Sequence, residues 1–253
     1  MATKLRRTPN IAPEDDSYDA RGSLLRYSFA DTRVRAINVS AIKNEPAALR
    51  PLADHPELDS VGLTKVEGVD LSPLEGLPLE WLSLERCSGL DLTPLAALAE
   101  LDTLTLNGLG AITVPERLEL SPKLRMLILV ADGRNELTAS VESLIRSVAW
   151  ERLPHLEGLT IRVGFDSPGW PAKVDLNFLR HLTGLTGLDI VRGVHHTATS
   201  PSPLQSPFDG LPRSLRGVRV DADDPERTRD ELSDYLGLPR WPTEGAPSVK
   251  PRD

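Results

Sequence analysis

The chain is poor in cysteine, in positive charge and in aromatic residues, and each shortage excludes a class of protein. Cys87 is the single cysteine in 253 residues, so no disulfide can form within the chain. Lys and Arg number 29 against 37 Asp and Glu, which gives a net charge of −8. A nucleic-acid partner is therefore not expected, because binding to phosphates needs a basic surface. Aromatic residues make up 4% of the chain, so aliphatic side chains must build the core.

Long apolar runs are missing as well. No stretch approaches the roughly 18 consecutive apolar residues that indicate a membrane span, so no membrane partner is predicted. Charged residues occur between Met1 and Arg7, but no apolar run follows before Pro13, which predicts that there is no signal peptide. These features favour a cytoplasmic protein, with an unrecognised secretion route as the alternative. The excess of Arg over Lys, with abundant Ala, Pro and Leu, favours a bacterial source.

Catalytic and cofactor motifs do not occur. The sequence holds neither Gly-x-Ser-x-Gly nor the phosphate-binding Gly-x-x-x-x-Gly-Lys-[Ser/Thr], which mark common nucleophile and nucleotide sites. His195 and His196 form the one histidine cluster, but no third ligand lies at a zinc-site spacing. We predict a surface loop there, no catalytic residue, no metal site, no cofactor and no enzymatic activity.

What the chain does contain is a repeated pattern: an apolar residue, two free positions, then apolar-x-apolar. Neighbouring copies are 24, 21, 22, 23, 32, 29 and 30 residues apart, a spacing close to the 20–29 residues of leucine-rich repeats. The longer steps indicate longer convex segments or inserted loops. The eight copies begin at Val34, Leu58, Leu79, Leu101, Leu124, Leu156, Leu185 and Leu215.

Each copy fits one strand with alternating faces. Val61 and Leu63 are expected to point inward and Gly62 outward, because successive side chains of a strand alternate across it. One strand cannot bury its own leucines, so neighbouring copies must stack. Ser72-Pro73 and Thr93-Pro94 predict a capping hydroxyl before a proline at the first helical position. The predicted fold is an α/β leucine-rich-repeat solenoid of about eight repeats, with a parallel sheet on the concave face and short helical or irregular convex segments.

The phrase Asp-Leu-[Ser/Thr]-Pro-Leu, seen at 70–74 and 91–95 before such strands, resembles the repeat of bacterial internalin-type leucine-rich-repeat proteins. The resemblance covers 33–223, is best over 58–110, and implies protein binding. That family usually places Asn at the ninth repeat position, so this chain is not expected to have a continuous asparagine ladder. Its ninth positions hold Ile42, Val66, Cys87, Leu109, Asp132, Gly164, Gly193 and Asp223. Cys87 is expected to be buried and inert.

Four segments follow from the pattern. Residues 1–22 are polar and predict a mobile N-terminal segment, and 23–223 predict the repeats with an N-terminal cap. Residues 224–241 predict a C-terminal capping helix, and 242–253, rich in Pro and charge, a disordered tail. Ser140 to Arg152 carries the apolar spacing of a helix.

Outward strand positions supply the candidate binding surface. In the strand 126–130 both faces are apolar, and Trp81 falls in the same row as Met126, which suits a binding hot spot with an aromatic anchor. Alternatively, the insertion after Asp132 folds over this strand and covers it. Phe165 and Trp170 in a later loop are anchors or local core. The candidate partner-binding residues are Trp81, Glu85, Met126, Ile128, Val130 and Arg162.

A charged row lies beside this surface. Asp59, Glu80 and Asp102 occupy the second position of successive copies, so like charges stack on neighbouring strands at a cost in stability. Such a row suits a basic partner, or it is a solvated edge where the cost is small.

The sequence thus predicts a non-enzymatic module that binds a protein partner on its concave face. The alternative, motivated by the acidic balance, is an inhibitor or immunity-type protein that neutralises a basic toxin or nuclease. An effector that uses the repeats to capture a substrate is less favoured, because 224–253 is too short for a catalytic segment.

Overall fold

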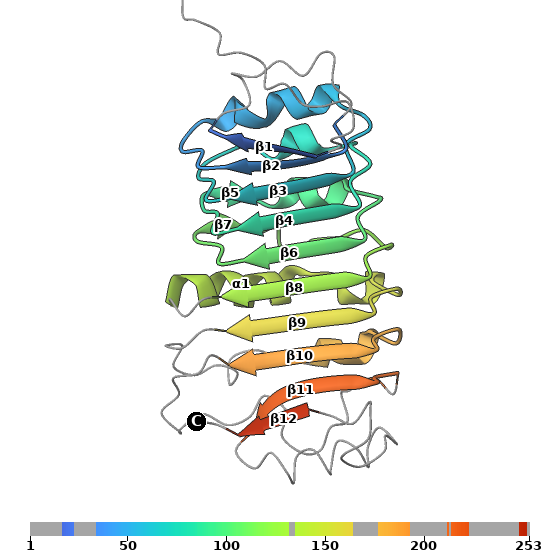
Figure 1. The fold of residues 1–253 in the computed structure, drawn as a ribbon. Coiled ribbons are helices and arrows are strands. Elements are labelled where there is room, and N and C mark those ends of the chain that lie inside the picture. The colour runs from blue at the N-terminus through green and yellow to red at the C-terminus, as the bar shows by residue number, and fades with distance from the viewer. Residues whose placement is uncertain are drawn as a thin grey trace, which may run out of the picture.

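A computed structural model describes residues 17–22, 34–131, 135–163, 177–192, 212, 214–222 and 248–251. Ten strands in these ranges form one parallel sheet, and their order in space follows their order in the chain (Figure 1). A separate two-stranded parallel sheet pairs β5 (Leu90–Asp91) with β7 (Ile112–Thr113). The ten strands are β1 (Ser17–Arg21), β2 (Ala36–Ser40), β3 (Ser60–Thr64), β4 (Trp81–Glu85), β6 (Thr103–Asn107), β8 (Met126–Ala131), β9 (Gly158–Val163), β10 (Gly187–Arg192), β11 (Gly217–Ala222) and β12 (Ser248–Pro251).

The register of the sheet confirms the repeat. Every predicted copy supplies one strand, and equivalent residues pair without a slip, as in Trp81 with Thr103 and Thr103 with Met126. The eight residues that begin the copies are all buried, as are inward residues such as Leu82 and Leu104. A parallel sheet of this kind is stable because each strand extends the core of its neighbour. The chain is therefore an α/β arrangement dominated by one parallel sheet.

Helical segments connect the strands, and α1 (Asn135–Ser147) passes behind the sheet in the view of Figure 1. This helix lies in the segment between β8 and β9 and buries Val141, Leu144 and Ile145 in the core. It ends at Ser147, and a separate short helix follows, so the helix predicted over 140–152 is divided in two. The helical segments are η2 (Pro46–Asp54), η3 (Ser72–Leu74), η4 (Thr93–Ala97), α1 (Asn135–Ser147), η5 (Trp150–Arg152) and η6 (Asn177–His181).

The predicted hydroxyl caps are wrong, and the aspartate two residues earlier takes that place. Asp70 Oδ1 accepts the backbone N–H of Ser72 at 2.9 Å, and its Oδ2 accepts the Ser72 hydroxyl at 2.7 Å. Asp91 accepts the same two groups of Thr93 at 2.9 and 2.7 Å. An aspartate side chain that bonds its own backbone two residues on forms a turn, so the repeated phrase encodes a turn that leads into η3 and η4.

Backbone hydrogen bonds link the turns that follow successive strands. Ala41, Lys65 and Arg86 adopt positive φ values of 59°, 55° and 53° at equivalent positions, and Gly108 occupies the next one. Each donates its N–H across to the following repeat, for example Lys65 to the carbonyl of Glu85 at 2.8 Å. The ninth positions from 42 to 109 hold buried apolar residues or cysteine and no asparagine. Backbone hydrogen bonds therefore connect these turns in place of an asparagine ladder.

Two predicted boundaries are wrong. Residues 17–21, placed in a mobile segment, form β1 and pair with β2 from Ser17 opposite Ala36 to Arg21 opposite Ser40. Residues 248–251, placed in a disordered tail, form β12 against β11. Both strands lack the leucine pattern, yet they cover edges that would otherwise present unpaired backbone groups. The predicted capping helix at 224–241 lies outside the described residues, as do Phe165, Trp170, His195 and His196.

Candidate protein-binding surface

The candidate surface lies on the face of the sheet that points away from the helical segments, here called the exposed face. Alternate residues of each strand reach this face, and the parallel register aligns them into rows across the sheet. The first row contains Ala36, Ser60, Trp81, Thr103, Met126, Gly158 and Gly187.

Trp81 and Met126 are the only large hydrophobic side chains exposed among the described residues, at 36% and 38%. Each lies against a glycine of a neighbouring strand. A Cβ on Gly62 would lie 3.6 Å from Cζ3 of Trp81, and a Cβ on Gly158 would lie 2.6 Å from Sδ of Met126. Gly158 therefore makes room for Met126, whereas a Cβ on Gly62 would clash with Oδ1 of Asn38 and would only touch Trp81 at an ordinary contact distance.

Ile128 and Val130 follow Met126 along β8 and are half-buried on the same face. Helix α1 packs Val141 and Leu144 into the core behind β8, and Met126 stays exposed. The interpretation in which the insertion folds over this strand is therefore wrong for 135–147, while 132–134 lie outside the described residues. An apolar strip thus runs along the exposed face of β8.

Glu85 and Arg162 lie in one row with Val130, at the far end of the strands. The Ser83 hydroxyl lies 3.5 Å from Oε1 of Glu85. Arg162 is exposed, and its guanidinium binds the carboxylate of Asp189 at 2.9 Å. The structure therefore brings all six predicted binding residues to one face, and their binding role stays a prediction. Sequence reasoning missed the pairing of Arg162 and the role of Gly158, although Gly158 is visible in register with Met126 once the rows are aligned.

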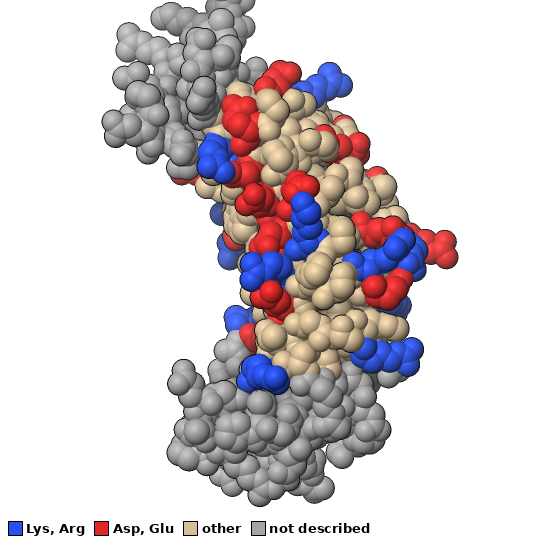
Figure 2. Space-filling view, turned by 90° about the vertical axis from the view of Figure 1, so that its right-hand side faces the viewer, with Lys and Arg blue, Asp and Glu red and all other residues tan. Residues whose placement is uncertain are grey.

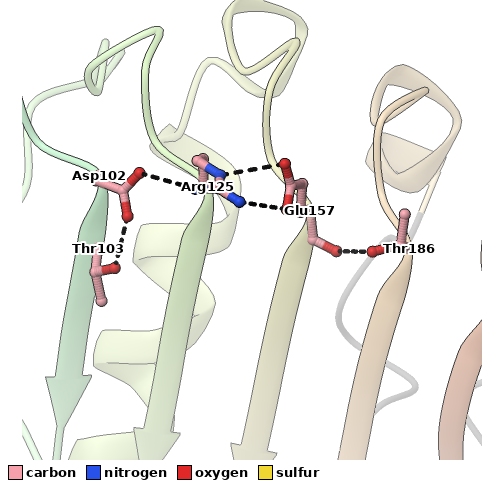
Figure 3. Close-up of polar contacts among 5 residues, drawn as sticks. All are labelled: Asp102, Thr103, Arg125, Glu157 and Thr186. Carbon is pink, nitrogen blue, oxygen red and sulfur yellow. Dashed lines mark hydrogen bonds and ion pairs between the residues drawn. The ribbon is translucent and has the colours of Figure 1, made fainter.

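The residues that immediately precede the strands form a second feature, here called the leading edge. Figure 3 shows Arg125 between two carboxylates: its guanidinium binds Glu157 at 3.0 and 3.1 Å and lies 4.0 Å from Asp102. Thr103 donates to Asp102 at 3.1 Å, and Thr186 donates to the backbone carbonyl of Glu157 at 3.1 Å. The hydrogen bond from Arg125 holds the pKa of Glu157 below its ordinary value and raises the pKa of Arg125.

Cationic residues offset most of the acidic row. Backbone hydrogen bonds confirm that Asp59, Glu80 and Asp102 stack on neighbouring strands, with Glu80 N–H on Asp59 O at 2.8 Å and Asp102 N–H on Glu80 O at 2.9 Å. However, Arg35 forms an ion pair with Asp59, and Arg125 lies beside Asp102. Figure 2, which views the molecule from this side, shows acidic and basic side chains interspersed. The leading edge is therefore a row of mixed charge.

Cys87 and Trp150 lie in the interior of the described part of the chain. Cys87 is fully buried, its Sγ lies 3.4 Å from the carbonyls of Leu63 and Glu85, and burial raises the pKa of the thiol to about 11. A thiol with a raised pKa is a poor nucleophile. Trp150 stacks on Phe178 with ring centroids 4.1 Å apart, as part of the core. Within the described ranges, no group of three or more His, Cys, Asp or Glu residues could hold a metal ion.

The described helices include none that is long and apolar enough to cross a membrane. No family model matches the chain, and no curated protein matches it. Among solved structures, the chain is similar to a chain in the octameric complex of Latrophilin 3 (Lec, Olf), Unc5D (Ig, Ig2, TSP1) and FLRT2 (LRR). The identity is 17% over 86% of this chain and 83% of that chain, with a TM-score of 0.32. These values are too low to support an argument from that complex.

Proposed function

We propose that the chain is a leucine-rich-repeat solenoid that acts as a non-enzymatic protein-binding module. Its binding site is the exposed face around Trp81, Met126, Ile128 and Val130. The observation that carries the proposal is the exposure of Trp81 and Met126 in one row of a sheet whose other described outward residues are mostly small or polar. Exposed apolar groups with a polar rim are typical of protein interaction sites.

The dimensions of the surface suit a macromolecular partner. Trp81 and Met126 are two strands apart, which corresponds to about 10 Å at a strand spacing of ~4.8 Å. Met126 and Val130 are four residues apart along β8, which corresponds to about 13 Å. The strands from β2 to β11 extend this face on both sides. A partner could therefore contact the apolar centre and the polar residues around it at the same time, as hot-spot interfaces require.

No observation favours the alternative of an inhibitor that neutralises a basic toxin or nuclease. That hypothesis depends on the net charge of −8. The acidic row that would attract such an enzyme is offset at Asp59 by Arg35 and at Asp102 by Arg125. The alternative of an effector that captures a substrate gains no support from Cys87, because this thiol is buried and has a raised pKa.

Affinity capture from the lysate of the source organism, followed by mass spectrometry, tests the proposal. The double variant Trp81→Ala/Ile128→Asp is expected to lose partners that the wild type retains, and Met126→Gln serves as a milder variant. Ser143→Asp, on the exposed part of α1 behind the sheet, is the matched control and should retain them. Circular dichroism shows whether each variant folds. Identical partner lists for wild type and the folded face variants would refute the assignment of this surface.

A further inference from the structure

The carboxylates on the exposed face and the leading edge differ in whether a cation lies beside them. From β3 to β10, four of the six have a cationic partner: Asp59 has Arg35, Asp102 and Glu157 share Arg125, and Asp189 has Arg162. The other two carboxylates are Glu80 and Glu85. Neither forms an ion pair within 4.0 Å among the described side chains.

Both of these carboxylates lie at the ends of β4, the strand that carries the exposed tryptophan. Glu80 immediately precedes Trp81 at the start of β4, and Glu85 ends the strand. They are five positions apart in the sequence, which corresponds to about 16 Å along a strand. A cation beside Glu80 could also lie on the exposed indole of Trp81, because tryptophan is the best aromatic partner for a cation. Strand β4 is therefore suited to bind positive charge.

The opposite side of the surface, at β8, is apolar. Strand β8 presents Met126, Ile128 and Val130, and the guanidinium groups of Arg125 and Arg162 flank it. Apolar side chains of a partner can bury surface there, and the two guanidinium groups already pair with Glu157 and Asp189. The candidate surface thus changes character across about 10 Å, from anionic and aromatic at β4 to apolar at β8.

Resting on the proposed function, we propose that the partner is a protein segment with Lys or Arg on one side and apolar residues on the other. Its cationic side chains pair with Glu80 and Glu85 and lie on Trp81. Its apolar side chains contact β8 at Met126 and Ile128. The partner's own net charge can take either sign, because the recognition depends on this local arrangement.

Selection of a phage-displayed random peptide library against the wild-type chain tests the chemistry directly. Enriched peptides are expected to combine Lys or Arg with aliphatic or aromatic residues. The selected peptides should bind Glu80→Gln/Glu85→Gln roughly tenfold more weakly than wild type. That loss should shrink as the salt concentration rises. Glu75→Gln/Glu116→Gln removes two exposed carboxylates elsewhere and is the matched control, expected to bind like wild type.

The outcomes separate this inference from the proposed function. If Trp81→Ala/Ile128→Asp abolishes peptide binding while Glu80→Gln/Glu85→Gln leaves it unchanged, the surface binds peptides but the cationic preference is wrong. If neither double variant weakens binding, both proposals fail. Enrichment of acidic or uncharged peptides only, or of no peptide at all, also overturns the inference.

Discussion

Asp91→Ala removes the side chain that forms the turn into η4. In the folded chain, Oδ1 of Asp91 accepts the backbone N–H of Thr93 at 2.9 Å and the Thr93 hydroxyl at 2.7 Å. N–H groups at the start of a helix have no partner within it, so the alanine variant leaves this N–H to solvent. The variant therefore destabilises the turn without changing the core.

The expected loss is about 0.5–2 kcal/mol, the usual cost of deleting a side-chain acceptor at a helix start. The exposed position favours the lower half of that range, because water replaces part of the lost hydrogen bonding. Asp91→Asn retains a carbonyl oxygen as acceptor and should recover most of the stability. Asp70→Ala removes the equivalent bonds to Ser72 one repeat earlier and should cost a similar amount.

The loss should also depend on pH. Hydrogen bonds from Thr93 hold the pKa of Asp91 below its ordinary value of 3.8. Because the pKa is lower in the folded state, the stabilisation is present above the ordinary value and is lost as the pH falls through the folded pKa. The difference between wild type and Asp91→Ala should therefore be largest at neutral pH and should shrink in acid below 3.8, by the part of the stabilisation that depends on the negative charge.

Urea unfolding followed by circular dichroism, at neutral pH and in acid, measures both effects. The unfolding slopes should stay equal, because the substitution changes little buried surface. Equal unfolding free energies for wild type and Asp91→Ala at neutral pH would refute the capping role. A difference that persists unchanged in acid would refute its electrostatic basis.

Three further predictions concern the core and the leading edge. Leu104→Ala, at a fully buried position, should lower the free energy of unfolding by roughly 2–5 kcal/mol in urea titrations, whereas Thr105→Ala on the exposed face should change it by about 0.5 kcal/mol at most. Equal losses would contradict the assigned strand faces. Cys87 should react with a thiol reagent far more slowly in the native than in the denatured chain; rapid native labelling would disprove its burial. Arg125→Gln should raise the pKa of Glu157 towards its ordinary value in an NMR titration, and an unchanged pKa would rule out the ion pair as the cause of its lowering.

Much of the sheet could be predicted because its information is local and periodic. The spacing from Leu79 to Leu101 predicts that Trp81 pairs with Thr103, and the structure has that pair. A one-residue slip would turn every buried leucine to solvent, so the apolar pattern specifies the register. The resemblance to the repeat family predicted that Cys87, at a ninth repeat position, is buried, and the structure confirms this. The periodicity of the apolar pattern also predicts the rows of outward residues. It therefore predicts that the six candidate residues share one face.

Features that depend on contacts between repeats could not be predicted in the same way. No periodic signal tells which neighbour a charged residue will pair with. The position of Arg125 between Asp102 and Glu157 could therefore not be predicted from the sequence. The aspartate turns were also missed, because Ser72 is by itself a plausible cap and the geometry decides which group accepts the hydrogen bond.

The sequence by itself determined the repeat, the strand register and the inward leucines, because burying every leucine leaves a single consistent alignment of the copies. The tertiary structure alone decided that β1 and β12 extend the sheet, since these strands join through backbone hydrogen bonds that carry no leucine pattern. It also decided that Trp81 lies over Gly62 while α1 packs behind the sheet. Both arrangements depend on the space that neighbouring repeats leave, which exists only once the strands have stacked.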